Sequence, residues 1–310
     1  MHVFVTGGSG WVGSRLVPDL IAHGHTVAAL ARSDRSAAAV RSAGAQVVPG
    51  SLDDLEVLAD AAASADAVVH LGFKHDIAFT GGYELAARDD RTAIDVLADP
   101  LTGTGKALVV ASGVLGVVGV GPGVVATEAD GTADHDTEGP VSGGGDRAAT
   151  ARHVLSFADR GIRASIVRLP PATHGVGDNG FTTTAVAAAR TAGASAYVGD
   201  GSNRWPAVHR DDAATLFRLA AEHAPAGSVL HAVAEEGVAV RDVAEAIAAG
   251  LGVPAISVDE SGIGRYLGFL AGFWSLDGPA ASEITRDLVG WAPTGATWLD
   301  DLHGRSYYRS

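Results

Sequence analysis

The chain of 310 residues contains no cysteine. It therefore has no disulfide, no thiolate nucleophile and no cysteine-ligated metal, and cysteine usage says nothing about the redox compartment. Positive charge is also scarce, because 22 lysine and arginine residues face 36 aspartate and glutamate residues, for a formal net charge of −14. Nucleic acids and anionic membranes are bound by basic patches, so this balance argues against both kinds of partner.

Long apolar runs are missing as well. No uninterrupted apolar stretch approaches the length that crosses a bilayer. Residues 1–6 are already predicted to form a strand, which leaves no room for a signal peptide. No histidine spacing is typical of a metal site, and no motif resembles the nucleophile elbow of a Ser-His-Asp hydrolase. We therefore expect a cytoplasmic protein without a metal.

A glycine-rich turn near the start of the chain is the clearest motif. It lies between an apolar run at 3–5 and an amphipathic stretch with helical spacing. Gly7 permits the sharp turn from strand to helix, Gly10 lets a pyrophosphate approach the backbone, and Gly13 lets helix and strand pack closely. The helix N-terminus offers free N–H groups to phosphates. This order of elements predicts a dinucleotide site.

Strands alternate with helices through the first half of the chain. The strands are predicted at 3–5, 26–31, 46–49, 67–71, 107–111 and 164–169. Short connections in this alternating order predict a doubly wound parallel sheet with right-handed crossovers and helices on both faces, which is a Rossmann-type α/β fold.

Two regions depart from the alternation. Residues 116–145 are rich in Gly, Asp, Glu and Thr, and we predict a mobile loop over the carboxyl ends of the strands. After Pro170-Pro171 the spacing becomes irregular, with helices near 181–192, 211–223, 240–250 and 279–289 and strands at 195–198, 205–208, 229–233 and 255–258. We predict a dinucleotide-binding Rossmann domain over 1–172. Residues 173–310 then form a smaller, mainly substrate-binding α/β lobe, with some segments returning to the Rossmann core.

Several of these motifs resemble the extended short-chain dehydrogenase/reductases, also called the NAD-dependent epimerase/dehydratase group. The turn at 6–13 resembles the signature T-G-x-x-G-x-x-G, and Gly-Ser-Leu-Asp at 50–53 is similar to the G-D-L-x-D turn that contacts adenine. His-Leu-Gly at 70–72 resembles the family's H-L-A segment, and residues 168–175 resemble its R-x-P-x-x-x-x-G stretch beside the nicotinamide.

The likeness covers most of the chain. Residues 204–212 and 288–293 look like two C-terminal landmarks, which we interpret as holding the substrate lobe together rather than as catalytic. The resemblance implies the following cofactor contacts: Thr6, Gly7, Ser9, Gly10, Trp11, Val12, Gly13, Arg32, Ser33, Arg35, Ser51, Leu52, Leu71, Gly72, Phe73, Lys74, Ser112, Pro170 and Pro171.

The residue that closes the second strand distinguishes the two nicotinamide cofactors. A carboxylate there bonds the ribose 2′-hydroxyl and repels a 2′-phosphate. This chain has Arg32, with Ser33 and Arg35 nearby. Guanidinium groups stay charged and offer several donors to phosphate. We therefore predict NADP rather than NAD; the alternative is a surface arginine that covers the adenine.

The catalytic pair of this family is absent from the sequence. The family carries Tyr-x-x-x-Lys on the helix after the fifth strand, where the lysine lowers the pKa of the tyrosine, the general acid and base. This chain has two lysines, at 74 and 106, and neither has a tyrosine four residues before it. Gly144 and Ala148 stand at the expected positions. The resemblance therefore implies an atypical member.

Four other side chains are candidates for catalysis. Ser112, at the end of the fifth strand, is placed to hydrogen-bond a substrate carbonyl, or it only caps the strand. Lys74 and His75 follow the fourth strand at the edge where ligands bind in such folds, although a Lys-His-Asp run is often solvated surface. Lys74 is a candidate for holding the ribose or a phosphate, and His75 for transferring protons near neutral pH. His174, after the sixth strand, is a similar candidate.

Two functions are compatible with these features. One is an NADP-dependent reductase or epimerase/dehydratase-like enzyme that acts on a small carbonyl or hydroxyl compound with a substitute proton donor. The other is a non-catalytic sensor of NADP(H), which the missing catalytic pair favours. An apolar cleft expected beneath residues 116–145 and 174–181 favours the enzyme, which is our prediction. Homodimers are usual for the family, so a homodimer is expected from the resemblance alone.

Overall fold

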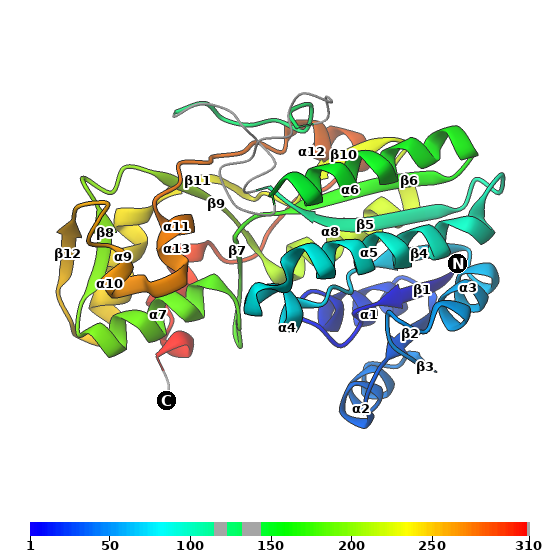
Figure 1. The fold of residues 1–310 in the computed structure, drawn as a ribbon, viewed down its shortest axis with the longest axis horizontal. Coiled ribbons are helices and arrows are strands. Elements are labelled where there is room, and N and C mark those ends of the chain that lie inside the picture. Colours follow the sequence, from blue (N-terminus) through cyan, green and yellow to red (C-terminus); the bar gives the residue numbers. More distant parts are fainter. Residues whose placement is uncertain (115–122, 132–143, 309–310) are drawn as a thin grey trace.

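Within residues 1–114, 123–131 and 144–308, which this computed structural model describes, seven strands form the central sheet (Figure 1). Their spatial order is β10 (Ser228–His231), β6 (Arg163–Leu169), β5 (Ala107–Gly113), β4 (Ala67–His70), β1 (His2–Thr6), β2 (Thr26–Ala31) and β3 (Gln46–Pro49). Each neighbouring pair is parallel. This confirms the predicted Rossmann-type sheet.

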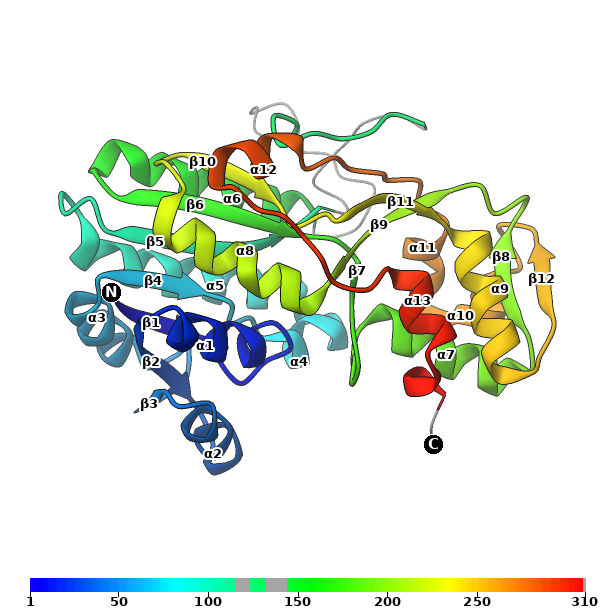
Figure 2. The ribbon, with the colours of Figure 1, turned by 180° about the vertical axis from the view of Figure 1, so that it is seen from behind.

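Helices cover both faces of the sheet (Figures 1 and 2). One face carries α1 (Gly13–Ala22), α2 (Asp34–Ser42), α8 (Arg210–His223) and α12 (Glu283–Val289), and the other carries α3 (Leu55–Ser64), α5 (Tyr83–Ala98) and α6 (Gly144–Ser156). Side chains alternate along a strand, so Val3 and Val5 pack on the first face and Phe4 on the second. Because β1 is buried on both faces, its sequence is an uninterrupted apolar run at residues 3–5.

A smaller lobe lies beyond the carboxyl ends of these strands (Figure 1). It contains a sheet of β11 (Glu235–Ala239), β9 (Arg204–His209) and β7 (Ala172–His174), and a pair of β12 (Ala255–Val258) and β8 (Ser195–Val198). Its helices are α7 (Phe181–Ala192), α9 (Val240–Leu251), α10 (Gly264–Leu267), α11 (Ala271–Trp274) and α13 (Trp298–His303). Aromatic rings fill its core: the Trp205 ring lies 5.0 Å from Trp274 and 6.3 Å from Trp298 between centroids.

Short helices complete the chain. They are α4 (His75–Ile77), a π-helical turn at Ala78–Gly82, and 3-10 turns at Asp99–Leu101, Phe157–Arg160, Gly268–Leu270 and Arg305–Tyr307. None of the helices in the described part of the chain combines the length and apolar character needed to cross a membrane.

Residues 123–131 lie within the predicted mobile loop over 116–145. Its flanking parts, 115–122 and 132–143, lie outside the described residues. The segment between them is docked, because the buried Glu128 accepts hydrogen bonds from the backbone N and Oγ1 of Thr285, at 2.7 and 2.6 Å. From β6, the buried Arg168 donates to the carbonyl oxygen of Asp130 at 2.7 Å. These contacts hold residues of 123–131 against α12 and β6, and the mobility of 116–145 stays a prediction.

Candidate functional site

The turn between β1 and α1 is so tight that two of its glycines leave no room for a side chain. Gly7 has a φ of +70°, and a Cβ on it would lie 2.8 Å from the backbone nitrogen of Gly72. A Cβ on Gly13 would collide with the carbonyl oxygen of Gly7. At Gly10 the nearest atom to an added Cβ is that same oxygen, at 3.0 Å. The close contact of Gly13 is thus with the turn itself.

The start of α1 offers unused hydrogen-bond donors. In the described part of the chain, the backbone N–H groups of Trp11 and Val12 donate to no protein acceptor. These groups lie at the positive end of the helix dipole of α1, an arrangement that binds phosphates. The turn therefore fits the pyrophosphate of a dinucleotide.

The side chain of Trp11 connects this turn to the smaller lobe. Its Nε1 donates to the carbonyl oxygen of Thr173 in β7 at 2.8 Å. The guanidinium of Arg210, at the start of α8, lies 4.2 Å from the centroid of the indole ring, which is a cation–π contact. Trp11 thus ties the glycine turn to β7 and α8.

Three of the predicted cofactor residues lie at the exposed end of β2. Arg32 extends from the first position after the strand, and its Nη1 lies 3.4 Å from Oδ2 of Asp76 in α4. Desolvation by itself would raise the pKa of Asp76, but the attraction of Arg32 and hydrogen bonds from backbone N–H groups together outweigh it, so the pKa of Asp76 is lowered. Ser33 caps α2 by accepting a hydrogen bond from the backbone nitrogen of Ser36 at 3.2 Å. Arg35 is exposed in the first turn of α2.

The turn after β3 is stabilised by its own side chains. The backbone nitrogen and hydroxyl of Ser51 both donate to Oδ2 of Asp54, at 2.7 and 2.9 Å, and these bonds lower the pKa of Asp54. Leu52 lies against Gly72, the residue after Leu71, because a Cβ on that glycine would lie 3.2 Å from the leucine. The predicted adenine-contacting residues therefore meet the end of β4.

Lys74 is held by two carboxylates. Its ammonium group lies 2.5 Å from Oδ1 of Asp53 and 2.7 Å from Oδ2 of Asp89. Burial opposes the charge, but these hydrogen bonds outweigh it and raise the pKa of Lys74. The structure thus places this predicted catalytic residue in a charge cluster between the β3 turn and α5. His75 is exposed, and its ring packs edge-on against Phe73 with centroids 5.0 Å apart.

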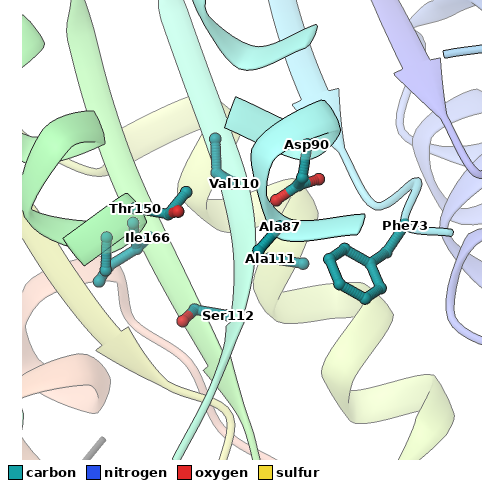
Figure 3. Close-up of a pocket in the computed structure, with 9 residues that line it drawn as sticks. Phe73, Ala87, Asp90, Val110, Ala111, Ser112, Thr150 and Ile166 are labelled. Atoms are coloured by element: carbon teal, nitrogen blue, oxygen red, sulfur yellow. The ribbon is translucent and has the colours of Figure 1, made fainter. Parts of the chain in front are cut away.

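A small pocket lies at the carboxyl end of β5, between α5 and α6 (Figure 3). Ser112, a predicted catalytic residue, is 7% exposed and lines this pocket. Two polar side chains from the flanking helices join it there, Asp90 from α5 and Thr150 from α6. The remaining lining is Phe73, Ala87, Val110, Ala111, Ala151 and Ile166. Ala148, at the position expected for the lysine, is buried in α6.

Asp90 belongs to a buried chain of hydrogen bonds that leads back to the glycine turn. Its Oδ1 lies 3.0 Å from Nε2 of His70, whose Nδ1 lies 2.8 Å from Oγ1 of Thr6. That hydroxyl also accepts a hydrogen bond from the backbone nitrogen of Gly72 at 3.1 Å. Asp90 was not among the residues predicted from the sequence, and His70 was predicted only as part of a backbone motif.

His174 lies in the smaller lobe, in a cluster separate from the pocket residues. It is fully buried in β7, where Nδ1 lies 2.6 Å from Oδ2 of Asp301 and Nε2 lies 3.8 Å from Oε2 of Glu235. Burial raises the pKa of Glu235. Pro170 is buried and Pro171 partly buried just before this strand. The structure thus does not place His174 together with Ser112.

No metal site emerges from the residues that the structure describes, because no three histidine, cysteine, aspartate or glutamate side chains gather closely enough there. The site instead combines a glycine turn with unused N–H donors, charged side chains after β2, β3 and β4, and a pocket at the end of β5.

Known proteins share this sequence and arrangement. Residues 3–233 match the profile of the NAD dependent epimerase/dehydratase family. The uncharacterized protein C2A9.02 of Schizosaccharomyces pombe is 40% identical over 308 residues, 99% of this chain and 100% of the relative. The uncharacterized protein YLL056C of Saccharomyces cerevisiae is 40% identical over 304 residues, 97% of this chain and 98% of the relative. UDP-glucose 4-epimerase of Thermus thermophilus, in complex with NAD, is similar in fold, with a TM-score of 0.74, 18% identity and 100% coverage of both chains.

Proposed function

The chain belongs to the NAD-dependent epimerase/dehydratase family, and we propose that it is an NADP-dependent oxidoreductase acting on a small carbonyl or hydroxyl compound. In this proposal Ser112 and Asp90 act in place of the family's tyrosine and lysine. The supporting observation is the pocket at the end of β5, which both side chains line. A protein that only sensed the cofactor would not need a polar pocket there.

A nicotinamide cofactor, when bound, supplies or accepts the hydride. The chain has to bind the reacting oxygen and move its proton. The Ser112 hydroxyl donates a hydrogen bond to that oxygen, which stabilises the negative charge that develops on it. The Asp90 carboxylate accepts the proton released when a hydroxyl is oxidised and returns it when a carbonyl is reduced.

The hydrogen bonds around His70 orient Asp90. Because the Thr6 hydroxyl accepts from Gly72, its own proton is available for Nδ1 of His70. The protonated Nε2 then donates to the carboxylate of Asp90. His70 and Thr6 do not line the pocket themselves, so in this proposal they are positioning residues for Asp90.

The preference for NADP rests on the exposed end of β2. Arg32 and Arg35 are both exposed there, and guanidinium groups bind phosphate through charge-assisted hydrogen bonds. This is where the adenosine ribose lies in a fold of this type. Family membership supports a nicotinamide dinucleotide, and these two side chains support the phosphorylated form.

The alternative function is a non-catalytic NADP(H) sensor. Lys74 favours it, because two carboxylates hold this side chain away from the role that the family's lysine plays at the ribose. A sensor would bind the cofactor and leave every carbonyl unchanged.

Turnover of a panel of aldehydes and ketones with NADPH tests the proposal. Ser112→Ala should lower kcat about a hundredfold, because a hydrogen bond made to the developing charge is lost. The NADPH affinity, measured by calorimetry, should stay within about twofold. The matched control is Ser165→Ala in β6, where the buried hydroxyl makes no hydrogen bond to the described residues. Tight NADPH binding without turnover of any compound would identify the sensor instead.

A further inference from the structure

Two opposite charges meet above the carboxyl end of β1. Arg32 follows β2 and Asp76 lies in α4 after β4, and these two strands flank β1 on either side. The side chains are 66% and 60% exposed and approach to 3.4 Å between Nη1 and Oδ2. The cation proposed to bind the 2′-phosphate therefore already has a carboxylate beside it.

Asp76 is held in this place by the residues before it. Lys74 fixes the chain just ahead of α4 through its contacts with Asp53 and Asp89. The backbone nitrogen of Ala78 then donates to the carbonyl oxygen of Lys74 at 3.0 Å, closing the turn that contains Asp76. The short helix α4 therefore presents Asp76 toward Arg32 as a built feature of the loop.

The 2′-phosphate of NADPH and the 2′-hydroxyl of NADH interact in opposite ways with such a pair. A 2′-phosphate carries close to two negative charges, so it competes with a carboxylate for a guanidinium and is repelled by that carboxylate. A 2′-hydroxyl carries a donor that a carboxylate accepts. We propose that Asp76 is a second specificity residue, which opposes the 2′-phosphate of NADPH at Arg32 and accepts the 2′-hydroxyl of NADH.

This inference rests on the proposed dinucleotide site and goes beyond it. Arg32 alone would make the site strongly selective for NADPH. With Asp76 beside it, the difference in affinity between NADPH and NADH becomes smaller. Removing the charge of Asp76 should therefore increase discrimination, without any contact to the nicotinamide end.

Calorimetric titration of the intact protein with NADPH and with NADH tests the inference. Asp76→Asn should lower the Kd for NADPH about tenfold at low ionic strength and raise the Kd for NADH about threefold. The gain for NADPH should shrink in 0.5 M salt, because both groups are exposed and screened. Asp242→Asn, which removes an exposed charge from the start of α9 in the smaller lobe, is the matched control and should leave both constants unchanged.

A double-mutant cycle separates competition from general repulsion. In an Arg32→Gln background, Asp76→Asn should improve NADPH binding by only about two- to threefold, because the guanidinium that Asp76 pairs with is gone. Weaker NADPH binding by Asp76→Asn alone would overturn the inference, since Asp76 would then orient Arg32 for the phosphate. Equal changes in the two Kd values for Asp76→Asn and for the control Asp242→Asn would overturn it as well. If the unaltered protein binds neither cofactor, the proposed dinucleotide site fails first.

Discussion

Two buried histidines, His70 and His174, each bond an aspartate, yet their surroundings differ. His70 lies 3.0 Å from Asp90, and this aspartate opens onto the pocket at the end of β5. His174 lies 2.6 Å from Asp301, and its other nitrogen faces Glu235 at 3.8 Å inside the lobe. The residue types are alike, so the position of the carboxylate relative to the sheet edge is what gives one pair access to the pocket.

The difference also separates two tasks. The His70 chain joins β1, β4 and α5 within the Rossmann core, beside the glycine turn. The His174 cluster joins β7, β11 and α13, three elements that are distant in sequence. We therefore assign proton transfer to the first and stability of the lobe to the second.

Matched asparagine variants of the two aspartates give the largest expected contrast. Asp90→Asn should lower turnover about a thousandfold, because an amide cannot accept the substrate proton. Asp301→Asn should leave turnover within about twofold, since its partner lies outside the pocket. Steady-state kinetics at saturating NADPH, together with calorimetric NADPH affinities, measures the difference. Equal losses in both variants would contradict the division of tasks.

Disrupting the His174 cluster should affect the stability of the protein more than its turnover. His174→Ala leaves the partly buried carboxylates of Asp301 and Glu235 without the imidazole, which should lower the free energy of unfolding by about 3 kcal/mol. Urea denaturation followed by circular dichroism measures this value. The folded variant should retain its turnover, and a selective loss of turnover at full stability would place His174 in catalysis after all.

The smallest expected effect is a pH dependence at Glu235. Burial raises the pKa of this side chain, so the folded state binds its proton more tightly than the unfolded state. The contribution of Glu235 to the free energy of unfolding is therefore lost as pH rises from the ordinary pKa of glutamate to the raised pKa. Relative to Glu235→Gln, the unaltered protein should lose at most about 1.4 kcal/mol per pH unit across that window. A difference that does not vary with pH would contradict this assignment.

Local patterns predicted the Rossmann sheet well because its strands are buried apolar runs with clear turn signals. The helix over 181–192 and the strands over 195–198 and 255–258 have the predicted bounds. Strand pairing was harder to predict, because β10 is far from β6 in sequence and yet lies beside it in the central sheet. The short elements β7, β11 and α13 were missed, since their few residues carry no periodic signal.

The sequence does indicate that Asp90 is buried, although Asp90 was not predicted as a site residue. It stands in the charged run Arg88-Asp89-Asp90-Arg91, which is typical of a solvated helix face. Helical spacing, however, places Asp90 four residues from both Ala86 and Ile94, on the buried face of α5. A charged residue on an apolar helix face needs a partner, and His70 is the polar residue that the apolar strand β4 supplies.

The contact of Trp11 with the smaller lobe has an optical consequence. Four of the five tryptophans are buried, with at most 2% of their surface exposed: Trp205, Trp274, Trp291 and Trp298. Trp11 is partly exposed in the glycine turn. A reduced nicotinamide cofactor absorbs light in the range where indole emits, so a dinucleotide held at this turn should quench Trp11 most efficiently. Because the same indole donates to Thr173, its emission should also change when β7 moves relative to the turn. One native fluorophore thus reports on the nucleotide and on the lobe together.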